Sequence, residues 1–181
     1  FSRRYSSGVN SAHETDLLAM EKLIDNKNYN ISSFKCEIPD YFFTDNIFNI
    51  TSVNTKTYIA MLASKYPKSF ISGANVDLSK TLQTASAKEF HHIFPDKFLQ
   101  RQGKKRKQIY QLANFCFLNN ADNQKIKDKD PKEYVKLLNQ QTIPDVLQAA
   151  ICPLNTFNLE YEKFIKERSK MLLAYANELI K

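Results

Sequence analysis

The sequence is poor in cysteine, and the cysteines that it has form no pair or cluster. Three occur, Cys36, Cys116 and Cys152, so their number is odd, their spacing is wide, and no CxxC motif is present. Secreted disulfide scaffolds and zinc cages both depend on regularly spaced cysteines. The sequence therefore argues against these two classes and predicts a protein of the reducing cytoplasm.

Long apolar runs are also absent. No stretch approaches the roughly 20 apolar residues of a membrane-spanning helix, and the first ten residues, FSRRYSSGVN, lack the apolar segment of a signal peptide. We therefore expect no membrane association. The 181 residues suffice for one domain with a buried core. Because the chain begins with Phe1 and not with Met, we expect it to be the C-terminal fragment of a longer protein.

Acidic residues are outnumbered, and the excess positive charge is concentrated in one place. The formal net charge is +7, and residues 88–107 alone contain seven Lys or Arg against two acidic residues, a local charge of +5. A basic surface favours a polyanionic partner. By itself, the GKKRKQ segment at 103–108 is equally well interpreted as a solvated loop. Its position close to a histidine pair favours contacts with phosphates.

Hydrophobic periodicity and helix-start signals predict a chain that is mostly helical. Ser11 and Glu14 have the spacing of a capping box, and Asp130-Pro131 predicts another helix start, since proline is well tolerated at the first helical position. Further helices are expected at 55–66, at 144–150 and at 157–179. A short helix or a strand is expected after Pro39, and a short turn or helix from Pro95 to about 103. The residues expected to face the core are Tyr58, Met61, Leu62, Tyr134, Leu137, Leu138, Phe157, Tyr161, Phe164, Ile165, Leu172, Tyr175 and Leu179.

Two short strands are expected among these helices, at 88–93 and 114–118, and a helix capped by Asn120 or Asp122 follows the second strand. The order strand, loop, strand, helix is that of a ββα unit. In such a unit the first turn of the helix lies against the end of the first strand, so Asp122 and Asn123 are expected near residues 91 and 92. The predicted fold class is α+β, mostly α.

Histidine is scarce, yet two of the three histidines, His91 and His92, are adjacent. Neighbouring side chains on a strand point to opposite faces, so the two imidazoles can share one site only if the strand bends there. Residues 93–95, Ile-Phe-Pro, are the expected bend. The alternative is that one histidine is a buried, hydrogen-bonded core residue and the other is an exposed surface residue.

The residues HHIFP at 91–95, NFCFL at 114–118 and Asn123 resemble the motif of the HNH, or His-Me finger, nucleases. That resemblance implies that His91 and Asn123 are metal ligands and that His92 is the general base. It also implies that Asn114 holds the loop of the base by hydrogen bonds. The nine-residue step from Asn114 to Asn123 is similar to that in colicin DNases and in the HNH domain of RNA-guided nucleases.

Longer phrases, HIFPDKFL, LANFCFLNNADNQKI and KDKDPKEYV, resemble the C-terminal nuclease domain of GmrSD-type restriction proteins, which attack modified phage DNA. The resemblance implies a single nuclease domain over 1–181. A ββα-metal core at about 87–128 would lie between helical parts at 11–80 and 131–181. It also implies a nucleotide-hydrolysing domain before the nuclease in the full-length protein.

The sequence departs from the wider family pattern at two positions. His91 stands where many members have Asp or Glu, and Lys127 stands where colicins have a third metal ligand. The remaining ligands are neutral. Mg²⁺ prefers oxygen ligands, whereas imidazole suits transition metals. We expect Mg²⁺ as the divalent cofactor, with Mn²⁺ or Ni²⁺ as alternatives.

The sequence thus predicts a metal-dependent endonuclease that hydrolyses DNA in bacterial defence against phage. Imidazole titrates near neutral pH and suits the removal of a proton from water. Two alternatives stay open: a nucleic-acid-binding module without catalysis on the same scaffold, and an RNase. The expected DNA-binding residues are Lys97, Arg101, Lys104, Lys105, Arg106 and Lys107.

Overall fold

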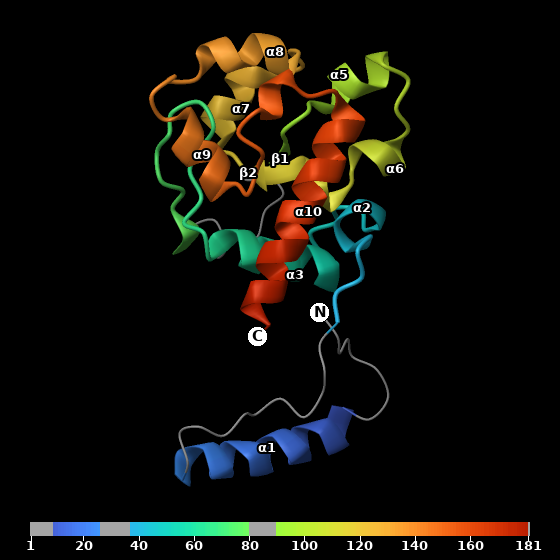
Figure 1. The fold of residues 1–181 in the computed structure, drawn as a ribbon, viewed down its shortest axis with the longest axis vertical. Helices are drawn as coiled ribbons and strands as arrows, with labels where there is room; N and C mark the ends of the chain where they lie inside the picture. Colours follow the sequence, from blue (N-terminus) through green and yellow to red (C-terminus); the bar gives the residue numbers. More distant parts are fainter. Residues whose placement is uncertain (1–8, 26–36, 80–89, 181) are drawn as a thin grey trace. The chain divides into compact units, whose positions relative to one another are not determined.

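A computed structural model describes residues 9–25, 37–79 and 90–180, and it divides the chain into two compact units, Phe1–Ile38 and Pro39–Lys181 (Figure 1). The first unit contains one described helix, α1 (Val9–Asp25). It begins two residues before the predicted cap Ser11, so Ser11 lies inside the helix and its carbonyl accepts a hydrogen bond from Thr15. The prediction of one nuclease domain over 1–181 stays a prediction.

The second unit is mixed α+β and mostly helical, as predicted. Its described helices are α2 (Phe42–Asp45), α3 (Val53–Ala63), α5 (Asp96–Arg101), α6 (Arg106–Ile109), α7 (Asn120–Ile126), α8 (Pro131–Tyr134), α9 (Ile143–Ala149) and α10 (Tyr161–Leu179). Short 3₁₀ segments are η2 (Leu112–Asn114), η3 (Val135–Leu137) and η4 (Thr156–Asn158). The strands are β1 (Phe90–His92) and β2 (Phe115–Phe117).

The two strands form an antiparallel hairpin that lies among the helices of this unit (Figure 1). His91 is opposite Cys116 and His92 is opposite Phe115. Both strands are shorter than predicted, and positions 88 and 89 of the first prediction lie outside the described residues. Helix α7 follows β2 directly, so the described chain has the predicted order of strand, strand and helix.

Helix α10 covers one side of the hairpin region and contacts α2 and η2 (Figure 1). Its predicted apolar stripe is buried at Phe164, Ile165 and Leu172. Leu179 is 50% exposed, so that part of the prediction is wrong, while Phe157 is buried as predicted but belongs to η4 and not to α10. The stripe is therefore core over the first three turns of the helix and leaves it towards the C-terminal end.

Arg168 of α10 is completely buried and was not predicted. Its guanidinium donates to four backbone carbonyls, those of Ala113 (2.7 Å), Phe115 (2.8 Å), Ala150 (2.8 Å) and Ile151 (3.3 Å). A buried charge without hydrogen-bond partners would cost several kcal/mol. Here the donors are used, and the side chain fixes the start of β2 against the end of α9.

Helix α3 supports the same strand from another direction. Ser52 caps it by accepting a hydrogen bond from the backbone N–H of Thr55. Tyr58, Met61 and Leu62 are buried, as predicted. The Tyr58 hydroxyl donates to the Phe115 carbonyl at 2.7 Å. The helix ends three residues earlier than predicted, at Ala63.

Local predictions after β2 had mixed outcomes. The helix start at Asp130-Pro131 is confirmed, because the Asp130 carboxylate accepts from the N–H of Lys132. Leu137 was expected in the core but is 44% exposed, while Leu138 is buried. In the described ranges, no helix combines the length and the apolar character that a bilayer crossing requires.

Candidate functional site

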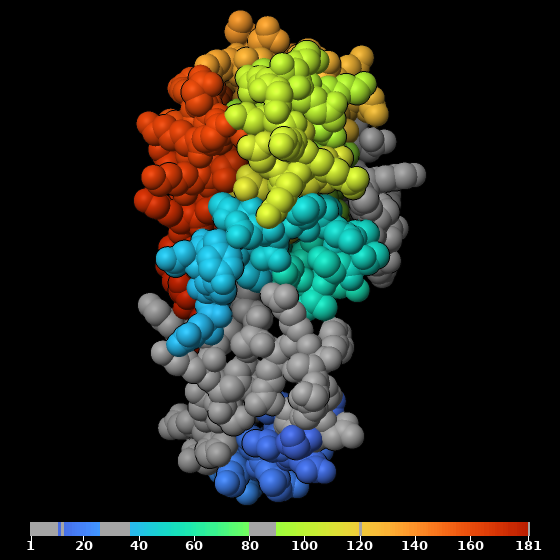
Figure 2. Space-filling view, turned by 90° about the vertical axis from the view of Figure 1, so that its right-hand side faces the viewer, coloured from blue at the N-terminus to red at the C-terminus, as the bar shows by residue number. Residues whose placement is uncertain are grey.

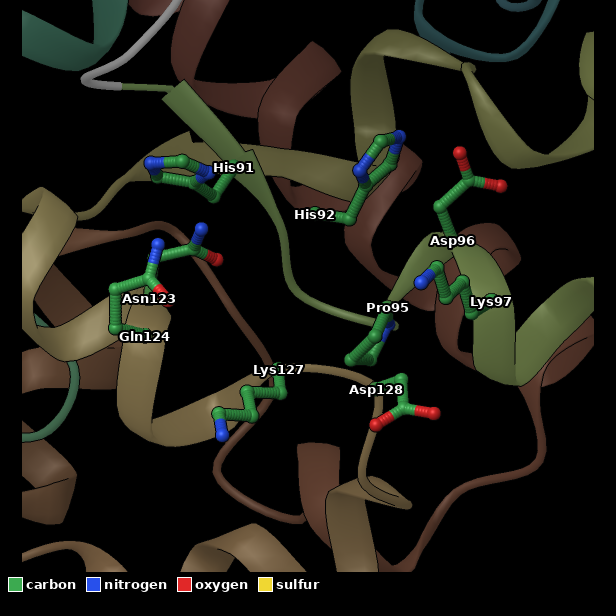
Figure 3. Close-up of a pocket in the computed structure, with 9 residues that line it drawn as sticks. All are labelled: His91, His92, Pro95, Asp96, Lys97, Asn123, Gln124, Lys127 and Asp128. Atoms are coloured by element: carbon green, nitrogen blue, oxygen red, sulfur yellow. The ribbon is translucent and has the colours of Figure 1, made fainter.

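A pocket of about 460 Å³ lies at the end of β1 (Figure 3). Its walls come from β1, from α5 and from α7 with the turn that follows it. The lining residues are His91, His92, Pro95, Asp96, Lys97, Asn123, Gln124, Lys127 and Asp128. The structure thus brings together the histidine pair, Asn123 and Lys97 from the predicted site.

The two histidines share this pocket because β1 ends in a tightly held bend. The N–H of Ile93 donates to the Asn114 carbonyl (2.8 Å), and the Ile93 carbonyl accepts from the Tyr134 hydroxyl (2.7 Å). The N–H of Phe94 donates to Asn114 Oδ1 (2.9 Å), and the Phe94 carbonyl accepts from Asn114 Nδ2 (3.1 Å). All four backbone polar groups of the bend therefore have partners inside the protein.

Asn114 is fully buried and makes most of these contacts. Its amide nitrogen also donates to the Ile109 carbonyl at 2.9 Å. The side chain therefore joins the bend after β1 to the end of α6. Buried polar groups that lose such partners cost about 1–3 kcal/mol each, so this one residue fixes the direction in which the chain leaves β1.

The His92 ring is enclosed by aromatic neighbours. Its centroid lies 4.2 Å from that of Phe115 and 4.8 Å from that of Tyr110, the latter in an edge-to-face arrangement. Its Nε2 atom is buried and has no hydrogen-bond partner among the described residues. Burial lowers the pKa of His92 to about 4, although the nearby Asp96 acts to raise it. His92 is therefore neutral at neutral pH.

Asp96 and Tyr110 were missed by the sequence analysis. The Tyr110 hydroxyl donates to Asp96 Oδ2 (3.0 Å), and the Gln100 side chain donates to Asp96 Oδ1 (2.7 Å). Asp96 is the first residue of α5, directly after Pro95, a position where a carboxylate is favoured by the helix dipole. That local signal was present in the sequence, but its link to His92 arises only through the fold.

Asp122 was predicted to lie near the histidines, but it does not line the pocket that they share. Its Oδ2 atom accepts from Ser69 Oγ (2.7 Å), from Ser72 Oγ (2.8 Å) and from the N–H of Ser72 (3.0 Å). Burial acts to raise the pKa of this carboxyl, but these hydrogen bonds lower it below its ordinary value. The cap of α7 is Asn119, not Asn120 or Asp122.

Asp122 nevertheless serves the pocket indirectly. It ties the first turn of α7 to the Ser69–Ser72 turn, and this fixes the helix that presents Asn123 to the pocket. His91 and Asn123 lie on the same side of the pocket in Figure 3.

The pocket offers His91 and Asn123 as donors for a metal ion. Within the described residues, no three His, Cys, Asp or Glu side chains are grouped closely enough to bind one. An imidazole nitrogen and an amide oxygen therefore make a sparse, neutral donor set. Such a set fits a divalent ion that keeps most of its coordination sites for water or phosphate oxygens, as Mg²⁺ commonly does.

The basic segment predicted to bind DNA divides into two groups. Lys97 lines the pocket, while Lys105, Arg106 and Lys107 are exposed at the start of α6. Arg101 instead donates to Asp128 Oδ2 (2.6 Å), and Lys104 forms an ion pair with Glu162 of α10. These two cations would have to exchange a carboxylate for a phosphate in order to bind DNA.

The same segment contains more structure than the loop that was predicted. Residues 106–109 form α6, and the Tyr161 hydroxyl of α10 donates to the Gln108 carbonyl at 2.6 Å. Figure 2 shows the yellow-green segment from α5 to α6 packed against α10 in red. The basic residues of α6 are therefore presented on a supported surface beside α5, whose first residues line the pocket.

Comparison with known proteins adds little about activity. No family model matches the chain, and no solved structure matches it. The uncharacterized protein MJ0686 of the archaeon Methanocaldococcus jannaschii is 27% identical over 140 residues. That match covers 75% of this chain and 23% of the archaeal protein, so the chain spans less than a quarter of the length of its relative. The function must therefore be argued from the pocket.

Proposed function

We propose that this chain is a metal-dependent endonuclease of the HNH type, with a ββα-metal core, that hydrolyses DNA phosphodiester bonds. One observation carries the proposal. His91, His92 and Asn123 line one pocket, at a bend whose backbone is held by Asn114. The resemblance of the sequence to HNH nucleases assigns roles to these four residues and to no others in the pocket.

In this proposal His92 takes a proton from the attacking water. Its pKa of about 4 keeps the imidazole neutral at neutral pH, while the same burial opposes the positive charge that the imidazole gains with the proton. The Asp96 carboxylate favours the charged imidazole and so stabilises it after the transfer. Asn114 acts as a positioning residue, because its hydrogen bonds fix the backbone that follows His92.

His91 and Asn123 would hold the divalent ion, with Mg²⁺ the first candidate and Mn²⁺ or Ni²⁺ the alternatives. When bound, such an ion supplies positive charge that stabilises the phosphate and the departing oxygen. The pocket is open enough for a phosphate, with about 460 Å³ of space. A defence role against modified phage DNA, a preceding nucleotide-hydrolysing domain and a cytoplasmic location are further parts of the proposal that rest on the sequence.

The deciding experiment is cleavage of supercoiled plasmid with Mg²⁺, Mn²⁺ or Ni²⁺, with EDTA as the negative control. We expect metal-dependent nicking or linearisation, and we expect His92→Ala to lose about 10²–10⁴ in rate while its circular dichroism spectrum stays unchanged. His91→Ala and Asn123→Ala should both weaken Mn²⁺ binding in calorimetric titrations. Cleavage by His92→Ala at more than a tenth of the wild-type rate would refute the base assignment.

The same experiment separates the alternatives. Binding of plasmid without cleavage by any of the three metals would favour the binding module, for which the sparse metal donor set is the supporting observation. An RNA of matched sequence belongs in the same series. Faster hydrolysis of RNA than of DNA would favour an RNase.

A further inference from the structure

Lys127 has a backbone conformation that its residue type disfavours. It follows the last residue of α7 with φ 51° and ψ −115°. A positive φ costs a residue with a Cβ about 1–3 kcal/mol in such regions, whereas glycine adopts it readily. Strained positions of this kind gather at functional sites. A lysine at a position that glycine would occupy with less strain is a candidate for a functional side chain.

The fold places Lys127 at the wall of the pocket. Its N–H donates to the Asn123 carbonyl at 2.9 Å, which holds Lys127 at the end of α7, one turn after Asn123. Both line the pocket. In Figure 3 Lys127 and Asp128 lie across the pocket from His92.

The charges around Lys127 indicate what it can bind. Both carboxylates of the pocket are engaged: Asp128 pairs with Arg101, and Asp96 accepts from Tyr110 and Gln100. Lys127 and Lys97 form no ion pair with any described residue. The two lysines and two aspartates of the lining cancel in charge, and Arg101, paired with Asp128, adds one positive charge. The charges at the pocket therefore sum to +1, which favours an added anion.

We infer that Lys127 contacts the phosphate of the nucleic-acid backbone at the centre of the site. This inference rests on the proposed function and adds a residue to it. An ammonium group has three donors and no lone pair, so it cannot be a metal ligand. It would repel a cation held by Asn123 unless an anion lies between them. A backbone phosphate between them would attract both the Lys127 ammonium and the cation. This gives the strained Lys127 a role that no neutral residue could take.

Binding of a short DNA duplex in EDTA tests this without any need for cleavage. Each phosphate contact contributes about −0.9 to the slope of log K against log salt. We expect Lys127→Met to make the slope shallower by about 0.9 and Lys127→Arg to restore it. Lys129→Met is the matched control, since the Lys129 ammonium donates to the Lys125 carbonyl and does not line the pocket. A Lys127→Met slope equal to that of the wild type would overturn the inference.

Comparison of Lys127→Gly with Lys127→Met separates the backbone strain from the side-chain charge. Both variants lose the charge, so both should bind DNA with the shallower salt slope. Only Lys127→Gly also loses the strain, so it should melt at a higher temperature than the wild type. If Lys127→Gly melts higher but binds like the wild type, the lysine has no phosphate role. If the Lys127 variants change the slope while the wild type cleaves nothing, the proposed function fails and the phosphate contact stands.

Discussion

The bend after β1 and the basic segment after it are neighbours in the sequence, but they are held in different ways. The bend is fixed by four buried hydrogen bonds from Asn114 and Tyr134. The basic segment is held by more exposed contacts, such as the ion pairs of Arg101 with Asp128 and of Lys104 with Glu162. Buried polar contacts cost far more to break than exposed ion pairs. The position of the histidines is therefore rigidly specified, while the charges beside them can rearrange around a partner.

Removing Asn114 should have the largest effect on stability. Asn114→Ala leaves the Phe94 N–H and two buried carbonyls without partners, so we expect the free energy of unfolding to fall by about 3–5 kcal/mol. Urea unfolding measures the loss. Asn155→Ala is the control, because Asn155 is exposed and makes no side-chain cap contact, and it should change stability by less than about 0.5 kcal/mol. A loss below 1 kcal/mol for Asn114→Ala would mean that the bend is held by other contacts.

Low pH should have the second-largest effect on the free energy of unfolding, and it should act through His92. Burial lowers the pKa of His92 from 6.5 to about 4, so below pH 6.5 the unfolded chain takes up a proton that the folded chain refuses. The contribution of neutral His92 to the free energy of unfolding is therefore fully present above pH 6.5. It is lost as the pH falls to about 4, and the loss amounts to up to about 3 kcal/mol. His92→Gln should lose this part of the pH dependence in urea titrations at pH 7, 5 and 4. Asp122, whose carboxyl pKa is lowered, adds a loss of stability at still lower pH, and this loss is the same in the wild type and in His92→Gln. Parallel curves for the two proteins would show that His92 is not the group responsible.

The basic segment should show the smallest change in stability and a clear change in binding. Replacing Lys104, Lys105, Arg106 and Lys107 by Ser removes one exposed ion pair, which costs at most about 1 kcal/mol. The slope of log K against log salt for duplex DNA should become shallower by about two to four, alike for all sequences, because phosphate contacts position a duplex without reading it. Metal affinity should not change. An unaltered slope would mean that DNA is held elsewhere.

Much of the local structure follows from local signals. The apolar face of 55–66, Asp130-Pro131 and the stripe Phe164, Ile165 and Leu172 are short-range patterns, and the helices they predict are present. Predictions went wrong where a contact from outside the element decides the outcome. Asp122 was expected near the histidines, but Ser69 and Ser72 hold its carboxylate and it does not line the pocket.

Local signals along the chain suffice to predict that the histidine pair ends a strand and that a helix with Asn123 follows a second strand, because these signals lie within a few residues of one another. The surroundings of the pair depend on contacts that are distant in the sequence. Tyr134 holds Ile93 from 41 positions away, and Arg168 holds β2 from 53 positions beyond Phe115. Such bonds join side chains to distant backbone carbonyls. They have no periodicity along the chain and no preferred spacing, so they arise only when packing brings donor and acceptor together.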